Sequence, residues 1–474
     1  MKKQDLAGKN VLVMGLGLHG GGVATARYLA EAGALVTCTD LRSAEELASS
    51  VAALEGTGVR FVLGEHREED FDGADLIVKN PAVPAGSPWL AGRTNVETDI
   101  SLFLRTTDQP ILAVTGSKGK STVVSALYHV LKRNRPGTRL GGNITVSPLS
   151  FSHDLAPGDP VILELSSWQL ADLRGRGLLK PEAACITNLM HDHQNRYASF
   201  ADYEADKTVI LEGQDAGGFA VLPDDEYGRR WSALASGRIA LVRPDAGGAP
   251  QESGIVRAWL DGSGRGWISG LPEDQATRGK GGPPEEIVPE RLKVPGLPFR
   301  LNCLFAAAMA RLFGCGAEEV RASLAGFEGV PYRMEMFLES GGIRCYDDTA
   351  ATIPDAAAAA VRAMDRPVVL IAGGTDKDLD FAPFDEAARI AKGIVLLEGS
   401  ATDKWLQRLR GLGAEILGVC GSMEEAVSAA AGALSPGDAL LLSPGAASFG
   451  LFRHEFERGD VFKAVCRHLF GSKG

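Results

Sequence analysis

The sequence has little that would suit a membrane, a nucleic acid or a secretory route. It contains no run near the ~18 consecutive apolar residues of a membrane-spanning helix. The formal net charge is −11, which argues against a basic surface for nucleic acid or anionic lipid. The opening MKKQDLAGKNVLVMG lacks the apolar core and cleavage site of a signal peptide. We therefore expect a soluble cytoplasmic protein with no nucleic-acid partner and no membrane partner.

Cysteines are also few and unpatterned. The chain of 474 residues has seven, and none forms a C-x-x-C pair. An odd set without metal-ligand spacing predicts reduced, buried thiols rather than a zinc site or a disulfide framework. The hydrophobic content of 45% is nevertheless ample for packed cores. The length suggests about three domains.

Strand-like apolar runs alternate with helix-like stretches along most of the chain, which predicts an α/β protein with parallel sheets. We expect three domains: a Rossmann-like domain at 1–105, a mononucleotide-binding domain at 106–331 and a second Rossmann-like domain at 332–474. The stretch 244–290 is rich in glycine, proline and charge, so it is predicted as loop with irregular strand. The run AAAAAV at 356–361 predicts a scaffold helix.

The first motif is GLGLHG at 15–20, after the strand-like run NVLVMG and ahead of a helix pattern. The spacing G-x-G-x-x-G is typical of turns that hold a diphosphate at a helix N-terminus, and Asp40 closes the next predicted strand. A dinucleotide and a nucleotide sugar satisfy this pattern equally well. A tight turn without any ligand is the structural alternative.

The second motif is TGSKGKST at 115–122, between a strand-like run and a helix pattern. The usual phosphate loop needs a glycine five residues before Gly119, but Val114 stands there, so this loop is a shorter form. Its amides can cradle phosphate oxygens, Lys120 can neutralise phosphate charge, and the Ser121 hydroxyl can bind Mg²⁺. The loop predicts nucleotide binding.

Three further signals follow the loop. Glu164 ends the strand-like run in ELSSWQL, where an acid can hold Mg²⁺, although Ser166 or Ser167 could simply cap a helix there. NLMHDHQNRY at 188–197 places an H-D-H cluster after another strand, at the edge where α/β sheets bind ligands. Lys207, in DYEADKTVI, would by itself be interpreted as a surface charge on a helix.

The order and spacing of TGSKGKS, ELSSWQL, NLMHDHQNRYAS and Lys207 resemble the Mur ligases, ATP-dependent enzymes that add amino acids in peptidoglycan synthesis. The short loop T-G-[ST]-x-G-K-[ST] is the form of that family. VKNPAVP, GGNI, GGTDKDLDF and LLSPGAASFGLFRHEFERGDVF extend the resemblance over nearly the whole chain. The pattern is most similar to members that add glutamate to UDP-N-acetylmuramoyl-L-alanine.

The resemblance implies a role for each matching residue. The UDP-sugar substrate would contact Gly15, Leu16, Gly17, Leu18, His19, Asp40, Arg42, Asn80 and Asn143. ATP would contact Thr115, Gly116, Ser117, Lys118, Gly119, Lys120, Ser121, Thr122, Asn302, Arg333 and Asp348. Two Mg²⁺ ions would be bound by Ser121, Glu164, His193 and a carbamylated Lys207. Lys377 and Ser448 would bind glutamate.

The implied chemistry is carboxylate activation by a monomeric enzyme. ATP phosphorylates the L-alanyl carboxylate, and the glutamate amine attacks the resulting acyl phosphate. Lys120, Lys207, His193 and Glu164 are the catalytic residues that the resemblance implies. Cations at the reacting oxygens are needed because both reacting groups are anionic.

The sequence departs from the family pattern at three places. GLPFRLN has Pro298 and Phe299 where the family has His-Asn, and DTAATI has Ala350 where the family has lysine. Glu455 stands where an aromatic residue is expected after Ser448. The resemblance implies D-glutamate as the amino acid, because D-glutamate is the more frequent substrate in the family, but these departures leave an L-glutamate-adding ligase open. An NAD-dependent Rossmann oxidoreductase and a catalytically lapsed Mur-like binding protein are the alternatives from other classes.

Overall fold

The computed structural model describes residues 3–18, 20–84, 86–190, 197, 199–245, 255–271, 283–377 and 379–471. The chain forms two compact units. The first comprises Met1–Glu290 with Leu301–Leu324, and the second comprises Arg291–Arg300 with Ala325–Gly474. Together they carry three α/β domains, each built on a sheet of its own, as the sequence predicts.

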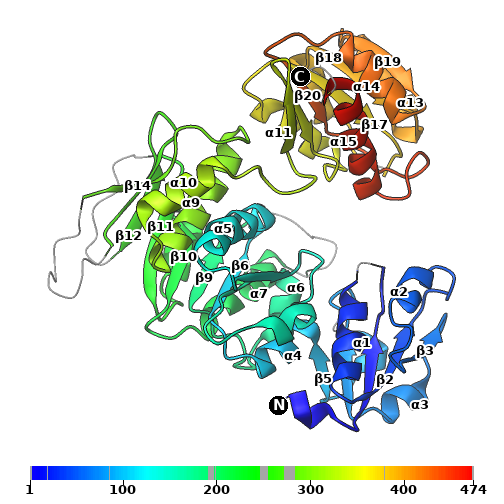
Figure 1. Ribbon diagram of the computed structural model, residues 1–474, viewed down its shortest axis with the longest axis vertical. Coiled ribbons are helices and arrows are strands. Elements are labelled where there is room, and N and C mark those ends of the chain that lie inside the picture. Colours follow the sequence, from blue (N-terminus) through cyan, green and yellow to red (C-terminus); the bar gives the residue numbers. More distant parts are fainter. Residues whose placement is uncertain are drawn as a thin grey trace. The chain divides into compact units, whose positions relative to one another are not determined.

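The amino-terminal domain is a parallel sheet in the order β3-β2-β1-β4-β5 (Figure 1). Its strands are β1 (Asn10–Met14), β2 (Leu35–Asp40), β3 (Arg60–Leu63), β4 (Leu76–Lys79) and β5 (Val96–Thr98). Its helices are η1 (Lys3–Leu6), α1 (Gly21–Glu31), α2 (Ala48–Ala52), α3 (Glu68–Asp72) and η2 (Pro88–Leu90). The strand order reverses at β1 and β4, so the carboxyl ends of these two strands open a crevice for a ligand.

The central sheet belongs to the same unit and has the order β14-β13-β12-β11-β10-β9-β6-β8-β7. Its strands are β6 (Ile111–Thr115), β7 (Arg139–Gly142), β8 (Val161–Glu164), β9 (Ala183–Ile186), β10 (Phe219–Pro223), β11 (Arg238–Arg243), β12 (Val256–Leu260), β13 (Gly266–Ser269) and β14 (Glu285–Val288). The strands from β7 to β12 are parallel, and β6 lies between β8 and β9. The carboxyl ends of β8, β6 and β9 therefore meet at one edge.

The prediction of loop with irregular strand for 244–290 understates the described part of that stretch, which carries the three strands β12, β13 and β14. β12 pairs antiparallel with β13, and β13 pairs antiparallel with β14, with a register shift between Gly266 and Trp267. In β12 every second side chain is buried, namely Val256, Ala258 and Leu260. Such alternation is typical of a strand with one buried face. The surrounding glycines, prolines and charges hid this short pattern.

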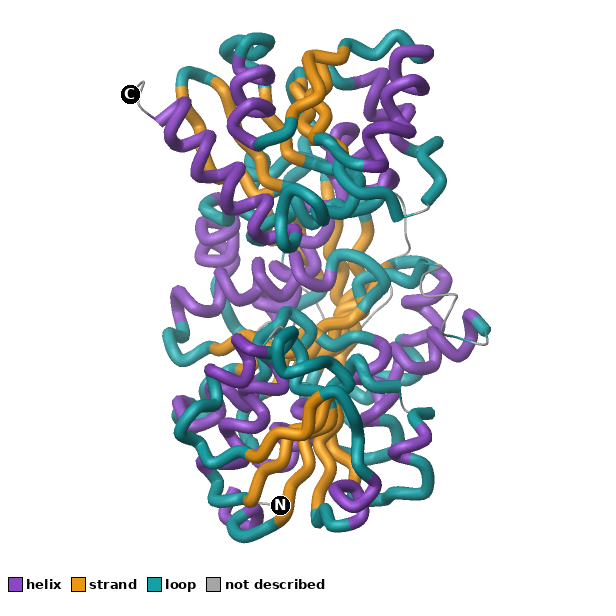
Figure 2. Tube along the Cα trace, turned by 90° about the vertical axis from the view of Figure 1, so that its right-hand side faces the viewer, coloured by secondary structure: helices purple, strands orange, loops and turns teal. Residues whose placement is uncertain are grey.

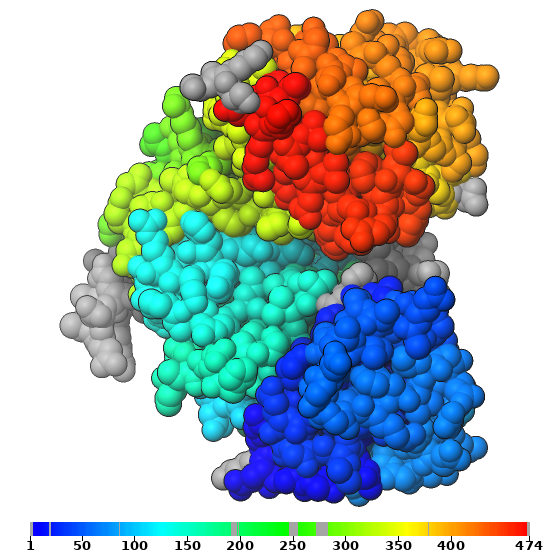
Figure 3. Space-filling model, turned by 45° about the vertical axis from the view of Figure 1, so that its right-hand side comes forward, coloured from blue at the N-terminus to red at the C-terminus, as the bar shows by residue number. Residues whose placement is uncertain are grey.

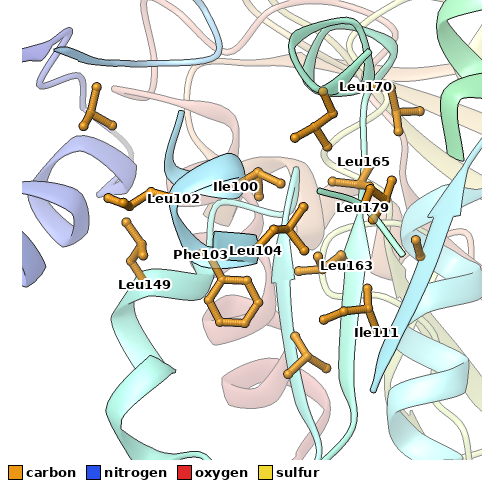
Figure 4. Packing of buried hydrophobic residues seen from close by; sticks show 14 of the residues in the cluster. Ile100, Leu102, Phe103, Leu104, Ile111, Leu149, Leu163, Leu165, Leu170 and Leu179 are labelled. Carbon is orange, nitrogen blue, oxygen red and sulfur yellow. The ribbon is translucent and has the colours of Figure 1, made fainter. Parts of the chain in front are cut away.

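The central helices are α4 (Asp99–Thr106), α5 (Lys120–Asn134), η3 (Pro148–Asp154), α6 (Ser167–Leu173), α7 (Phe200–Glu212), α8 (Glu226–Trp231), α9 (Leu297–Leu312) and α10 (Ala317–Ala325). Helix α4 leads from β5 of the first sheet to β6 of the second, and it is capped by Thr98 and Ser101 in a capping box. Its apolar residues Ile100, Phe103 and Leu104 lie among leucines of the central domain (Figure 4). One hydrophobic cluster thus joins the first two domains.

The space-filling view agrees with this shared core. The amino-terminal residues (blue) and the central residues (cyan), both in the first unit, meet along one face (Figure 3). The buried ion pair of Lys79 on β4 with Asp172 on α6, 2.7 Å long, adds a polar contact between the same domains. A cavity lined from both domains can therefore have defined walls.

The carboxyl-terminal sheet, in the second unit, has the order β15-β16-β20-β17-β18-β19. Its strands are β15 (Glu335–Ser340), β16 (Ile343–Asp347), β17 (Val368–Gly373), β18 (Gly393–Leu397), β19 (Ile416–Cys420) and β20 (Ala439–Leu442). Its helices are α11 (Pro354–Ala363), α12 (Phe384–Ile390), α13 (Ser400–Gly411), α14 (Met423–Ala431) and α15 (Glu455–Gly471). Helices flank the strands on both sides (Figure 2). The predicted scaffold helix over 356–361 is confirmed as part of α11.

Two expectations about composition can be compared with the structure. All seven cysteines lie in described ranges, and each is buried and free of a disulfide. No helix in the described part of the chain is long and apolar enough to cross a bilayer.

Candidate active site

The loop at 115–122 joins β6 to α5 and depends on two glycines with positive φ. Gly116 has φ 146°, and a Cβ there would lie 2.0 Å from Thr187 Oγ1. Gly119 has φ 87°, and a Cβ there would lie 2.3 Å from Asn302 Oδ1. Both the conformation and the close neighbours exclude larger residues. Asn302, predicted at the ATP site, therefore lies against the phosphate loop.

Helix α5 begins at Lys120, directly after Gly119, and no side chain caps its first amides. Such amides, with the helix dipole, favour an anion. Lys120 Nζ donates hydrogen bonds to the Gly116 carbonyl at 2.9 Å and to the Ser117 carbonyl at 3.3 Å. The lysine side chain thus folds back over the loop, where a phosphate group would lie.

The loop is held by residues that follow β9 and that the sequence analysis did not single out. The Lys118 amide donates to Asn188 Oδ1 at 2.9 Å, and Asn188 Nδ2 donates to the Lys118 carbonyl at 3.0 Å. Thr187 Oγ1 donates to the same carbonyl at 2.6 Å. The side chains of Thr187 and Asn188 therefore fix the loop before any ligand arrives. Their position at the end of β9, directly before the H-D-H motif, is the signal that could have identified them.

Lys207 on α7 is buried, with 2% of its surface exposed. Its Nζ donates to the Gly116 carbonyl at 2.9 Å and lies 4.5 Å from the centroid of the Tyr203 ring. A surface charge on a helix would be solvated, so that interpretation of Lys207 is wrong. The structure brings Lys207 and Lys120 to the same carbonyl of the phosphate loop.

Glu164 is buried at the carboxyl end of β8, in register with Val114 of β6. Its Oε1 accepts a hydrogen bond from Asn143 Nδ2 at 3.0 Å. Ser166 caps α6 in a capping box with Gln169. The capping alternative is therefore confirmed for Ser166, and it does not conflict with the position of Glu164 at the end of β8. The predicted residues His19 and His193 lie outside the described residues.

The donor set suits a hard cation. Mg²⁺ prefers oxygen ligands, and the edge of the sheet offers the Glu164 carboxylate and the Ser121 hydroxyl. The Thr115 hydroxyl, at the end of β6, is buried and makes no hydrogen bond in the described structure. Within the described ranges no three His, Cys, Asp or Glu residues cluster as a metal site. A cation here would therefore rely on loop hydroxyls, phosphate oxygens and water as well as Glu164.

A cavity of about 840 Å³ opens at the crevice between β1 and β4. The described residues predicted to bind the UDP-sugar all line it: Gly15, Leu16, Gly17, Leu18, Asp40, Arg42, Asn80 and Asn143. Trp168 and Gln169 of the central domain also line it, as do His66 and Trp89 of the first domain. These four were not predicted. Because Asn143 lines the cavity and also bonds Glu164, the cavity reaches the edge of the central sheet where the phosphate loop begins.

The glycine turn of this cavity is stabilised from both sides. Asp40 Oδ2 accepts from the Gly17 amide at 3.0 Å, and Asp40 Oδ1 accepts from the Arg42 amide at 3.0 Å. A Cβ on Gly15 would lie 2.9 Å from Asn80 Cβ, so the turn packs tightly on that side chain. Each carboxylate oxygen of Asp40 thus accepts one backbone hydrogen bond and retains acceptor capacity for a ligand.

In the second unit, Arg333 and Asp348 lie close together. Asp348 Oδ1 accepts from the Met334 amide at 3.1 Å, and Asp348 Oδ2 accepts from Ser443 Oγ at 2.7 Å. Burial raises the pKa of Asp348 to about 7, and the Arg333 charge opposes this shift. Burial likewise raises the pKa of the adjacent Asp347 to about 6. This corner contains carboxyl groups that titrate near neutrality.

The segments that carry the two predicted glutamate-binding residues pair with each other in the second unit. Backbone hydrogen bonds of 2.9 and 3.0 Å join Thr375 and Ala447, the neighbours of the segments that carry Lys377 and Ser448. Lys377 Nζ donates to Thr352 Oγ1 at 3.0 Å. The sequence analysis missed Thr352, although it lies in the DTAATI segment. An ammonium beside a hydroxyl side chain suits a carboxylate ligand.

The departures from the family pattern have defined surroundings. The Phe299 ring stacks on Phe327, with centroids 5.7 Å apart. The Ala350 amide donates to the Tyr332 carbonyl at 3.1 Å, and the Glu455 carbonyl accepts from Thr349 Oγ1 at 2.9 Å. Buried Arg458 donates to Thr349 Oγ1 at 2.9 Å and supports the same segment. The loop with Ala350 is therefore fixed by α15 rather than left open.

Comparison with known families covers most of the chain. Residues 9–101 match the family described as Mur ligase MurD-like, N-terminal domain. Residues 114–243 match the Mur ligase middle domain, and residues 332–445 match the Mur ligase, glutamate ligase domain. The three matches follow the three sheets in order.

Curated relatives agree over nearly full length. The chain is 41% identical to the UDP-N-acetylmuramoylalanine--D-glutamate ligase of Roseiflexus sp. (strain RS-1), covering 97% of this chain and 99% of that protein. It is 38% identical to the enzyme of the same name from Treponema pallidum (strain Nichols), covering 98% of each chain.

Solved structures support the fold. The UDP-N-acetylmuramate-alanine ligase MurC of Thermotoga maritima aligns with a TM-score of 0.56 at 20% identity, over 92% of this chain and 96% of that one. The MurF ligase of the same organism, solved in complex with ADP, aligns with a TM-score of 0.54 at 15% identity, over 99% and 100%. With the phosphate loop, the substrate cavity and the three matched domains in place, this chain belongs to the Mur ligase family.

Proposed function

We propose that this chain is an ATP-dependent ligase that joins D-glutamate to UDP-N-acetylmuramoyl-L-alanine, in the synthesis of peptidoglycan precursors. One observation carries the proposal: Asn143 lines the cavity of the first domain and also binds Glu164 at the edge of the central sheet where the phosphate loop begins. A UDP-sugar in that cavity would extend toward a nucleotide on the loop. Neither a nucleotide-binding module nor an oxidoreductase needs this junction.

The chemistry couples ATP cleavage to formation of a peptide bond. ATP supplies the phosphoryl group that converts the L-alanyl carboxylate to an acyl phosphate, and the glutamate amine then displaces phosphate from the carbonyl carbon. Lys120 and the first amides of α5 hold the transferred phosphoryl group and offset its charge. The loop backbone does this without rearrangement, because Thr187 and Asn188 already fix it.

We assign Ser121, Glu164, His193 and Lys207 to two Mg²⁺ sites. Bound Mg²⁺ would neutralise charge on the phosphate and acyl oxygens. Burial of Lys207 at the loop fits a lysine whose amine reacts with CO₂, because a carbamate would convert a buried cation into an anionic ligand. Such a change would explain a lysine in a metal-binding position.

We assign the second unit to ATP and the amino acid. Arg333 and Asp348 are placed at the ATP phosphate and ribose, and Lys377 and Ser448 at the glutamate carboxylates. The ammonium of Lys377 beside Thr352 favours an acidic amino acid, because a side-chain carboxylate can make a charge-assisted hydrogen bond there that a neutral side chain cannot make. The domain boundaries at 105/106 and 331/332 are part of this proposal, as are a monomeric enzyme and a cytoplasmic location.

The proposal is tested by omission. Phosphate release should require ATP, Mg²⁺, UDP-N-acetylmuramoyl-L-alanine and glutamate together, and NAD(H) should have no effect. Phosphate release without the UDP-sugar would indicate an unrelated ATPase. Hydride transfer to NAD without ATP would favour the oxidoreductase, and binding without turnover would favour a lapsed ligase.

A further inference from the structure

The cavity of the first domain has two ends that the sheet order distinguishes. β4 and β5 face the central domain, because Lys79 pairs with Asp172 and α4 packs into the central core. β2 and β3 lie on the opposite side of β1. The glycine turn after β1 is in the middle, where a diphosphate would bind. The sugar would extend toward the central domain, so the nucleoside would lie near the ends of β2 and β3.

His66, which follows β3, lines the cavity at this nucleoside end. Its ring lies edge-on to Phe71, with centroids 5.7 Å apart, and to Trp89, with centroids 5.4 Å apart. Phe71 and Trp89 stack on each other at 5.1 Å. This cluster holds the imidazole in one orientation, which a residue that recognises a ligand requires.

The hydrogen bonds of His66 define its tautomer. Thr39 Oγ1 lies 3.1 Å from the Glu65 carbonyl oxygen and 2.7 Å from His66 Nδ1. A carbonyl only accepts, so the single hydroxyl proton of Thr39 goes to Glu65. In this arrangement His66 Nδ1 carries the proton and donates to Thr39. His66 Nε2 is left with a lone pair, and no described residue donates to it.

Burial lowers the pKa of His66 from its usual value, although the Asp40 charge opposes this shift. The ring is therefore neutral at pH 7, and Nε2 is an acceptor. Among the pyrimidines, uracil presents an N–H donor at N3, whereas cytosine presents an acceptor there. An acceptor on the protein distinguishes the two.

We propose that His66 determines base specificity: its Nε2 accepts a hydrogen bond from N3–H of the uracil in the substrate. This inference rests on the proposed function, because it deepens recognition of the uridine substrate. Cytosine would place its N3 lone pair against that of Nε2. An unmade hydrogen bond of this kind costs about ten-fold to a hundred-fold in kcat/KM.

The test compares kcat/KM for UDP- and CDP-N-acetylmuramoyl-L-alanine in the wild type and three variants. His66→Phe keeps an aromatic ring but loses the acceptor, and His66→Gln keeps an acceptor near the position of Nε2. Trp89→Phe is the matched control, since it changes the same cluster without changing the acceptor. The preference for uridine should persist in wild type and Trp89→Phe, and it should fall to about three-fold or less in His66→Phe, which has no acceptor, and in His66→Gln, whose amide can also donate to cytosine N3. A wild-type preference in His66→Phe would overturn the proposal.

A second measurement needs no substitution and no turnover. In ¹⁵N-labelled wild-type protein, the His66 Nε2 resonance should be that of an unprotonated nitrogen and should shift on addition of UDP but not of CDP. A protonated Nε2, or equal shifts with both nucleotides, would refute the assignment. This binding experiment distinguishes failure of the His66 proposal from failure of the proposed function, because His66 can distinguish the two bases even if the protein has no ligase activity.

Discussion

At the residue scale, the burial of Lys207 is the feature that the sequence alone explains least well. As a member of DYEADKTVI it has the pattern of a solvated helix charge, yet it is 2% exposed and donates to the carbonyl of Gly116. Only the family resemblance gave it a role, because burial of a long side chain depends on what packs over the helix. The same reason hid Thr187, Asn188 and His66, whose partners lie far away in the sequence.

Removal of the Lys207 side chain should therefore abolish most of the activity. We expect Lys207→Ala to lower kcat on the order of 10²–10³, as for the loss of an oriented catalytic group. If the lysine carries a carbamate, formate or acetate should restore part of the rate. Lys180→Ala, which removes an exposed lysine, is the control and should stay within about two-fold of wild type. Wild-type activity in Lys207→Ala would remove Lys207 from the active site.

Asp348 gives a second prediction at this scale. Its pKa is raised to about 7 by burial, so it binds a proton in the folded state that an unfolded chain releases near pH 4. This group stabilises the fold fully below pH 4, and the contribution is lost as the pH rises toward 7. Asp348→Asn resembles the protonated acid. The melting temperature of Asp348→Asn minus that of wild type should increase by roughly a few degrees from pH 5 to pH 8. A difference independent of pH would contradict the raised pKa.

At the scale of elements, most strands were predictable because buried parallel strands are continuous apolar runs. The runs at β1, β6 and β17 are entirely or almost entirely buried, as such strands should be. β3 was not singled out because it is short and only partly buried, and β12 to β14 were expected only as irregular strand because loops rich in glycine and charge surround them. The phosphate loop was predictable in kind, but its contact with Asn302 of α9 was not.

This contact gives a prediction for the start of α5. Gly119→Ala should raise the KM for ATP at least about ten-fold, because φ 87° is strained for alanine and its Cβ would meet Asn302. The control is Gly158→Ala, because Gly158 also has a positive φ but has open space where a Cβ would lie. Gly137→Ala would not serve as a control, because a Cβ at Gly137 would clash with Asp159. A wild-type KM in Gly119→Ala would show that the loop does not bind the nucleotide.

At the scale of the whole molecule, the binding residues divide between two compact units. The cavity proposed for the UDP-sugar and the phosphate loop belong to the first unit, whereas Lys377, Thr352 and Ser448, which we propose for glutamate, belong to the second. Lys377→Ala should therefore raise the KM for glutamate by about ten-fold or more while the affinity for UDP-N-acetylmuramoyl-L-alanine stays unchanged. Isothermal titration measures the affinity for the UDP-sugar, and steady-state kinetics measure the KM for glutamate. Equal losses for both substrates would contradict this division.

The preference for one enantiomer of glutamate is the property that the departures from the family pattern affect most directly. Ala350 and Glu455 replace two side chains that this pattern expects near the amino acid. Relatives at 38–41% identity are named as D-glutamate ligases, which supports D-glutamate for this chain. The sequence pattern left both enantiomers open, because single substitutions near a chiral ligand do not determine which enantiomer binds.

The most direct test of the central claim is the product itself. Purified protein is incubated with ATP, Mg²⁺ and UDP-N-acetylmuramoyl-L-alanine, together with either D- or L-glutamate, and the UDP-linked product is identified by mass spectrometry alongside ADP. We predict a UDP-sugar heavier by one glutamyl residue, formed with one ADP per bond and with a higher kcat/KM for D-glutamate. Formation of ADP without the glutamylated product, or a product formed without ATP, would contradict the account.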